Sequence, residues 1–149
     1  MTERIARATA WLKTARAVTT EDRNMQLFGL SWAGVDERAR APLAKAILSK
    51  QRADGGWSQS ESLASDAYAT GVTLAALAEA GGIKTDHPAY KRGVAYLLST
   101  QRADGSWYVR SRAAKFQPFF DGGFPYGHDQ WISQAATAWA TIGLASAAP

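Results

Sequence analysis

The segment from residue 108 to residue 131 carries the side chains of this sequence that are best suited to chemistry. Its aromatic and cationic residues are Tyr108, Phe116, Phe119, Phe120, Phe124, Tyr126 and Trp131, with Arg110, Arg112 and Lys115 among them. Such a set suits a pocket for an apolar ligand with a polar or anionic head, and ring faces also stabilise cationic character. We therefore expect ligand-lining roles for Trp107, Tyr108, Phe119, Phe120, Phe124, Tyr126 and Trp131. The alternative is a loop that packs its own aromatics over the helix ends, held by turns at 121–123 and 125–127.

Imidazole and carboxylate groups lie close together near the end of this segment. His128 and Asp129, with Asp121, are catalytic candidates and belong to the side-chain types that ligate zinc. Their spacing matches no strong metal site, and the absence of cysteine excludes disulfides, thiolate ligands and a thiol nucleophile. We expect no metal and no cofactor. A sugar-active enzyme would instead need Asp66 paired with Asp121 or Asp129 as two catalytic carboxylates.

A repeated heptapeptide indicates which elements position these residues. QRADGGW, residues 51–57, returns as QRADGSW, residues 101–107. A repeat at this spacing indicates one supersecondary unit used more than once, and Asp-Gly is a strong turn signal after a helix. The glutamine can bind backbone groups at a helix end, and the tryptophan can cover the neighbouring unit and donate its ring N–H. We predict that Gln51, Trp57, Gln101 and Trp107 form a structural clasp between units.

Each heptapeptide lies between two segments with helical patterns. A helix with Pro42 in its first turn precedes the first copy, and Ala-rich helices rich in small residues follow both copies. Thr70 aligns with Thr137, and a degenerate earlier copy is visible when Leu27 is set on Leu74. The third unit begins near His87, with Thr85 or Asp86 as its helix cap. We predict an all-α chain, a single domain of three hairpins over residues 2–34, 36–81 and 86–147, with the small residues forming a tight inner layer.

Length and composition agree with one globular domain. The chain has 149 residues, 46% hydrophobic and 20% charged, with a net charge of +4. Since lysine and arginine are scattered over the predicted helices, we expect no nucleic-acid partner. No apolar run is long enough for a transmembrane segment, and the first residues lack the apolar core of a signal peptide. The compartment and the oligomeric state stay open.

The third unit carries a family resemblance. RGVAYLLSTQRADGSW, residues 92–107, resembles the QW repeat of the squalene-hopene and oxidosqualene cyclases, and AKAILSKQRADGGW, residues 44–57, is a weaker match. The resemblance implies an α/α toroid, also known from prenyltransferases, in which inner and outer helices alternate around a cavity. Closed rings of this kind hold about six hairpins, so three correspond to half a ring. The chain is then a segment of a longer protein, as its abrupt end favours, or one of two copies that complete a ring, or an open half-ring.

The resemblance also indicates which chemistry to look for. Its protonating members carry Asp-x-Asp-Asp before a Thr-Ala helix, and setting that threonine on Thr70 leaves Asp66 as the first aspartate. Tyr68 takes the proton donor's position, and a phenol with a pKa near 10 is a poor acid for an alkene. Asp66 is better explained as a helix N-terminal residue. The prenyltransferase zinc site needs a cysteine, which this chain lacks.

Two functions follow from the resemblance. The first is a binding or scaffold module of cyclase-like architecture that takes an apolar or isoprenoid-like small molecule without catalysing its cyclisation. The alternative is a part of a squalene-type isoprenoid cyclase whose catalytic residues lie on a missing half or on a partner chain.

Overall fold

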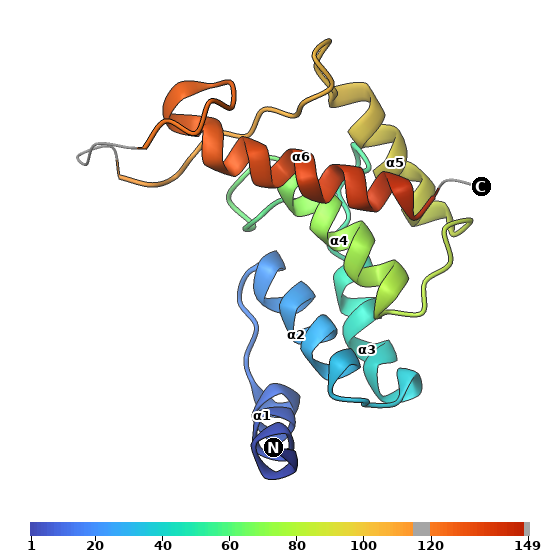
Figure 1. The fold of residues 1–149 in the computed structure, drawn as a ribbon. Helices are drawn as coiled ribbons and strands as arrows, with labels where there is room; N and C mark the ends of the chain where they lie inside the picture. Colours follow the sequence, from blue (N-terminus) through green and yellow to red (C-terminus); the bar gives the residue numbers. More distant parts are fainter. Residues whose placement is uncertain (115–119, 148–149) are drawn as a thin grey trace.

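The computed structural model describes residues 1–114 and 120–147, and every regular element in them is helical. In chain order the elements are α1 (Thr2–Thr14), α2 (Thr20–Trp32), α3 (Glu37–Leu48), α4 (Ala67–Glu79), α5 (Pro88–Thr100), the short 3-10 helix η1 (Gly127–Asp129) and α6 (Gln130–Ala145). We call the successive pairs α1–α2, α3–α4 and α5–α6 hairpins, following the division predicted from the sequence (Figure 1). The predicted all-α fold is therefore confirmed, and among the described helices none is long and apolar enough to cross a membrane.

Two helix starts differ from those expected from the sequence. α3 begins at Glu37, because the side chain of Asp36 accepts a hydrogen bond from the backbone N–H of Arg38 at 2.8 Å, so Pro42 lies inside the helix. α5 is capped by His87, whose Nδ1 accepts from the N–H of Ala89 at 3.2 Å. In both cases a side chain at the N-cap satisfies a backbone donor that the first helical turn leaves free.

The second helices of the hairpins form an inner layer centred on α4. This helix lies between α2 and α6, and its residues from Ala69 to Leu77 are all buried (Figure 1). Gly71 permits the close approach of α6, since a Cβ added there would lie 2.5 Å from the backbone nitrogen of Ala140. A helix buried on all sides needs no polar face. This explains why α4 is apolar around its whole circumference.

The two tryptophans of the repeated heptapeptide occupy equivalent core positions. The ring N–H of Trp57 donates to the carbonyl of Ile47 at 2.9 Å, and that of Trp107 donates to the carbonyl of Leu97 at 2.8 Å. Both rings are almost fully buried. Each ring thus ties its turn back to the first helix of its own hairpin.

The backbone of each tryptophan is held by the second helix. The N–H of Trp57 donates to Thr70 Oγ1 and that of Trp107 to Thr137 Oγ1, both at 3.0 Å. These matched bonds agree with the alignment of Thr70 on Thr137. Each heptapeptide therefore joins both helices of its hairpin.

The two glutamines of the repeat differ in their surroundings. Gln51 Nε2 donates to the carbonyl of Gly55 at 2.8 Å and to that of Ala89, in the next hairpin, at 2.7 Å. Gln101 Nε2 donates to the carbonyl of Gly105 at 3.0 Å and is exposed. Gln51 thus fastens two hairpins together through a turn carbonyl and the start of α5, not through the end of its own helix.

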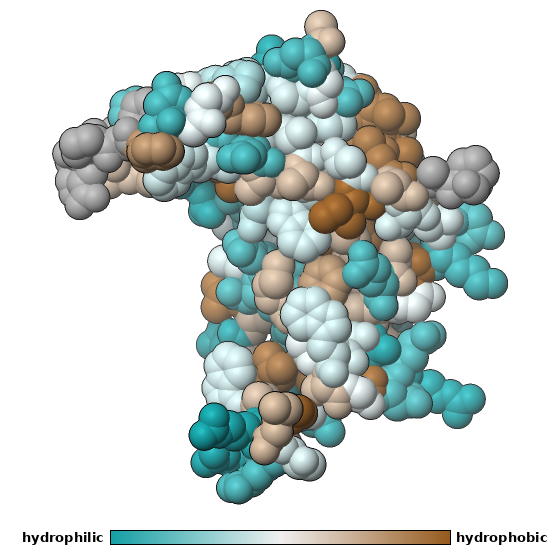
Figure 2. All heavy atoms as spheres, in the orientation of Figure 1, coloured by the Kyte–Doolittle hydropathy of each residue, from teal (hydrophilic) through white to brown (hydrophobic). Residues whose placement is uncertain are grey.

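The described hairpins form an open arrangement. α1 lies at one end of the molecule and α5 with α6 at the other (Figure 1). Figure 2 shows that the face beneath the N-terminal end of α6 is hollowed. The site described next lies where the connections before α4 and before α6 meet.

Candidate binding pocket between two hairpin connections

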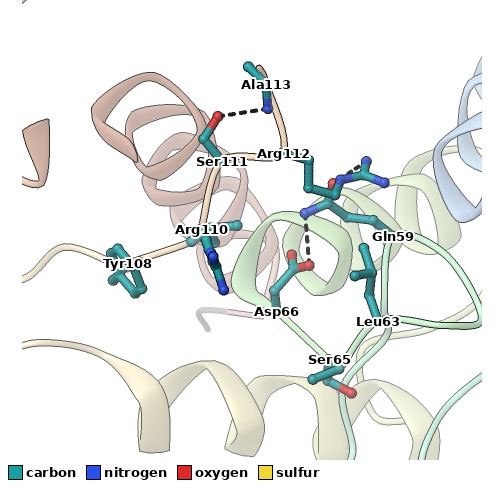
Figure 3. Close-up of a pocket in the computed structure, with 11 residues that line it drawn as sticks. Gln59, Leu63, Ser65, Asp66, Tyr108, Arg110, Ser111, Arg112 and Ala113 are labelled. Atoms are coloured by element: carbon teal, nitrogen blue, oxygen red, sulfur yellow. Dashed lines mark hydrogen bonds between the residues drawn. The ribbon is translucent and has the colours of Figure 1, made fainter. Parts of the chain in front are cut away.

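A pocket of about 620 Å³ lies between two connections that follow the repeated tryptophans. Its walls are the residues before α4, namely Gln59, Leu63, Ala64, Ser65 and Asp66, and the residues after Trp107, namely Tyr108, Val109, Arg110, Ser111, Arg112 and Ala113. Figure 3 shows these two walls facing one another. The volume lies within the usual range of about 300–1,000 Å³ for small-molecule sites.

A hydrogen-bonded chain of polar groups crosses from one wall to the other. Arg112 donates to Gln59 Oε1 at 2.8 Å, and Gln59 Nε2 donates to Asp66 Oδ2 at 2.9 Å (Figure 3). The other carboxylate oxygen of Asp66 accepts from the N–H of Ala69 at 2.8 Å and caps α4. Asp66 therefore does the capping work expected of a residue at a helix N-terminus.

The environment of Asp66 makes it a weak proton donor. Burial raises the pKa of the Asp66 carboxyl above its ordinary value of 3.8, and the hydrogen bonds from Ala69 and Gln59 act in the opposite direction. A raised pKa means a weaker acid, and protonating an alkene demands a strong one. Both oxygens also already accept hydrogen bonds, so they are engaged with the protein and not with the pocket.

Tyr68 lies outside the lining of this pocket. Its hydroxyl donates to Glu21 Oε1 of α2 at 3.0 Å. Burial and the negative charge of Glu21 raise the pKa of Tyr68 to about 12. The hydroxyl is thus committed to a contact between two inner helices, and its acidity has moved away from that of a useful acid.

Asp129, a catalytic candidate at the other end of the insertion, supports the arginine-bearing wall. Asp129 Oδ1 accepts from the N–H of Ser111 at 2.9 Å and its Oδ2 accepts from the hydroxyl of Tyr108 at 2.8 Å. His128 precedes it in η1 and is exposed. Among the described residues no cluster of three or more His, Asp or Glu has an arrangement that could hold a metal ion.

The predicted ligand-lining aromatics fall into separate groups. Tyr108 lines the pocket, and its ring packs edge-on against Tyr126 with centroids 5.2 Å apart, which in turn packs against Phe124 at 6.3 Å. Trp131 is exposed and donates its ring N–H to the carbonyl of Phe120 at 3.1 Å. These contacts are those of a loop whose aromatics pack on one another.

The remaining two candidates have different positions. Trp107 is a core residue that also borders a smaller cavity of about 280 Å³ next to the pocket, together with Tyr108. Phe119, like Phe116 and Lys115, lies outside the described residues. Of the aromatics predicted to line a ligand site, Tyr108 is thus the one that the structure places in the wall of the large pocket.

The sequence interpretation overlooked the wall before α4. Gln59 is buried and joins three partners, and Leu63 supplies apolar surface, yet both lie in a short connection that carried no motif. No sequence signal marks Gln59, because its hydrogen bonds follow from its burial, which a short polar connection does not reveal. Its role depends on Arg112, which is distant in sequence.

Comparisons with known proteins agree on one family. The sequence profile of the squalene-hopene cyclase C-terminal domain matches residues 23–126. A squalene-hopene cyclase of Bradyrhizobium diazoefficiens is 37% identical over 94 residues, covering 54% of this chain and 14% of that protein. A drimenyl diphosphate synthase of Streptomyces showdoensis is 32% identical over 98 residues, covering 63% of this chain and 18% of that protein. The chain thus matches less than a fifth of the length of either relative.

Proposed function

Because this chain belongs to the squalene-hopene cyclase C-terminal domain family, we propose that it binds an isoprenoid through the pocket between its second and third hairpins. In this proposal the chain does not itself supply the proton that initiates cyclisation. The pocket carries the proposal. It combines apolar surface from Leu63 and Tyr108 with the cations Arg110 and Arg112. That combination suits a ligand with a hydrocarbon tail and an anionic head.

A diphosphate is the head group that this wall suits best. Arginine binds phosphate through its planar array of donors, and Arg110 and Arg112 lie two residues apart in the connection that lines this pocket. One relative is named a drimenyl diphosphate synthase, which supports a diphosphate-bearing ligand here. Asp66 faces the same pocket, but its oxygens are engaged by Gln59 and by the N-terminus of α4, which limits repulsion of the ligand.

Neither of the two acid candidates, Asp66 and Tyr68, has surroundings that strengthen it as an acid. The pKa of Asp66 is raised by burial, and the pKa of Tyr68 is raised to about 12. Both changes weaken the group as an acid. The proposal therefore assigns binding to this chain and the initiating proton to a group that lies elsewhere.

The test compares two ligands that differ in the head group. We expect farnesyl diphosphate to bind more tightly than farnesol, measured by calorimetry and by quenching of tryptophan fluorescence. Arg110→Gln or Arg112→Gln removes a charge-assisted contact, worth about 1.5–3 kcal/mol when buried and less on this exposed wall, so we expect about tenfold weaker binding of the diphosphate.

Matched controls separate the site from general charge. Arg38→Gln removes an exposed arginine near the start of α3 and should leave binding unchanged. The affinity for farnesol should change little in Arg110→Gln, because farnesol lacks the negative charge of the diphosphate. Equal affinities for the two ligands, or equal losses from Arg38→Gln and Arg110→Gln, would contradict the proposed site.

The second candidate is a part of a cyclase that acts once an acid from elsewhere is supplied. Membership of the family favours it, since the matched relatives are a squalene-hopene cyclase and a drimenyl diphosphate synthase. Incubating the full-length protein with squalene or with prenyl diphosphates should then give cyclised products on chromatography. Recovery of starting material alone would sink this alternative and leave the binding role.

A further inference from the structure

The repeated clasp shows how one hairpin receives the next. Gln51, at the end of α3, donates to the carbonyl of Ala89 at the start of α5, and the guanidinium of Arg92 donates back to Gln51 Oε1. The turn lies against the same helix, since a Cβ added to Gly55 would be 2.7 Å from the carbonyl oxygen of Arg92. The interface between the second and third hairpins therefore has a defined polar contact with residues from both sides.

The second copy of the motif, which follows α5, has no such contact with another hairpin in the described part of the chain. Gln101 is exposed where Gln51 is half-buried, and no described atom comes within 4 Å of a Cβ added to Gly105. Leu98, on the last turn of α5, is 58% exposed. The end of the molecule made by α5 and α6 thus carries the same contact groups as the interface between the second and third hairpins, but no described residue packs against them.

The helix that could supply that side is present at the other end of the chain. In α1, RATAWL begins at Arg7, and in α5, RGVAYL begins at Arg92. Arg7 thus matches the arginine that contacts Gln51, and Ala8 matches Gly93, which lies against the tryptophan of the preceding hairpin. α1 has the sequence of a clasp-receiving helix.

A structural contact supports this alignment independently of the sequence. The carbonyl of Leu97 in α5 accepts from the ring N–H of Trp107, and the carbonyl at the aligned position in α1, Leu12, accepts from Gln26 Nε2 at 2.6 Å. The same backbone position of each outer helix is therefore used to join it to its own hairpin. α1 and α5 are equivalent elements of the repeat.

α1 is also exposed and basic. None of its residues is buried, and Trp11, the counterpart of a half-buried tyrosine in α5, is 68% exposed. Its charged residues are Glu3, Arg4, Arg7 and Lys13. The opposite end of the molecule presents both Arg102 and Asp104 beside Gln101, so the two ends match in motif and not through opposite net charge.

We propose that the α5–α6 end of one copy of this chain docks on α1 of a second copy, repeating the contact between the second and third hairpins. Gln101 donates to the backbone carbonyl of Arg4, the counterpart of Ala89, and Arg7 donates to Gln101 Oε1. Two such contacts related by a twofold axis join two copies of three hairpins into a closed ring. The proposal does not depend on what the pocket binds.

A pair of differences between the repeats lowers the steric cost of Ala8 at this position. A Cβ on Gly93 would lie 2.8 Å from Cδ2 of Leu74, which is fully buried and has little space to turn away. In the proposed contact Ala8 takes the place of Gly93, and Thr141, four residues after Thr137, takes the place of Leu74. Threonine lacks the δ carbon that would clash, and Thr141 is exposed. The tryptophan ring remains as a neighbour: Trp57 Cζ3 would lie 3.0 Å from a Cβ on Gly93, so its counterpart Trp107 has to shift by a few tenths of an ångström to admit the methyl group of Ala8.

The test measures the mass of the chain by light scattering after size exclusion, without ligand, over a range of concentrations. We expect a dimer for the wild-type chain and a dissociation constant raised at least about tenfold by Gln101→Arg, which sets two cations against each other, or by Arg7→Glu. The double variant Arg7→Glu with Gln101→Arg should recover the dimer. Arg38→Glu, on an exposed turn of α3, is the charge control.

The outcomes separate the second copy from other occupants of this face. A chain that stays monomeric at about millimolar concentration overturns the proposal and leaves a further hairpin of a longer polypeptide as the occupant. A dimer that is indifferent to both single substitutions, or a double variant that fails to recover, overturns it as well. All the altered side chains are exposed, so each variant should keep the helix content of the wild-type chain, which circular dichroism checks. Farnesyl diphosphate binding is scored separately, so failure of one proposal does not decide the other.

Discussion

Replacing Gly71 by alanine tests whether the inner layer depends on direct backbone contact between α4 and α6. A Cβ at this position would lie 2.5 Å from the nitrogen of Ala140 and 2.5 Å from the carbonyl carbon of Trp139. Non-bonded heavy atoms prefer about 3.5–4.0 Å. Because both clashing atoms belong to the backbone, no side-chain rotation relieves the contact, and the two helices have to separate by about 1 Å.

The expected magnitude follows from two opposing effects. Alanine gains up to about 1 kcal/mol over glycine in a helix interior. Overpacking a close-packed core costs about 1–3 kcal/mol and occasionally more, and a backbone clash lies at the upper end. We therefore expect Gly71→Ala to lower the free energy of unfolding by about 2 kcal/mol. For a chain of this size that corresponds to a fall in Tm of about 4–8 °C.

The assay is urea unfolding followed by circular dichroism, with Gly29→Ala as the matched control. A Cβ at Gly29 would lie 2.9 Å from Leu12 Cδ1, the tip of a flexible side chain that can turn away. The control should therefore be neutral or slightly stabilising. A Gly71→Ala variant as stable as the wild-type chain would refute the claim that α4 and α6 pack backbone to backbone.

Two further substitutions test the clasp and the pocket. Thr70→Val should lower the free energy of unfolding by about 1–3 kcal/mol, because it leaves the buried N–H of Trp57 without a hydrogen-bond acceptor. Thr137→Val should lower it less, because the corresponding bond from Trp107 is only partly buried. Equal losses on urea unfolding would contradict this difference in burial. Since burial raises the pKa of Asp66, the unfolded chain loses this proton first as the pH rises above 3.8, and the folded state loses stability over the interval up to the folded pKa. The free energy of unfolding of the wild-type chain should therefore fall relative to that of Asp66→Asn as the pH rises through this interval, and a constant difference would contradict a raised pKa of the Asp66 carboxyl.

Much of the fold could be predicted from the sequence because the repeat is visible as two nearly identical segments. Two copies of one heptapeptide, with Thr70 aligned on Thr137, are enough to locate the turns and the inner helices. The start of α3 could not be predicted so well, since Pro42 in a first turn competes with Asp36 as a cap further upstream. Both signals are local, and the sequence pattern alone does not show which of the two residues marks the first turn.

The site was less accessible to prediction because its parts come from different hairpins. The aromatic residues and arginines of the insertion attract attention by their types, yet the pocket wall opposite them is built around Gln59, which no motif marks. The pairing of Arg112 with Gln59 spans 53 positions. Long-range side-chain contacts of this kind carry no periodic signal, so sequence patterns find the richer wall and miss its partner.

The same repeat explains why the pocket lies where it does. The connections that lead into α2, α4 and α6 lie in order around one side of the molecule, and Gln59 joins all three: its carbonyl accepts from the N–H of Thr20 at 3.1 Å, and its side chain binds Asp66 and Arg112. A cavity forms between each neighbouring pair of connections, about 250 Å³ between the first and second and about 620 Å³ between the second and third. The larger cavity adjoins the longer connection. The proposed binding site thus occupies a position that recurs in the repeat, at the surface between two connections whose helices are held by the core.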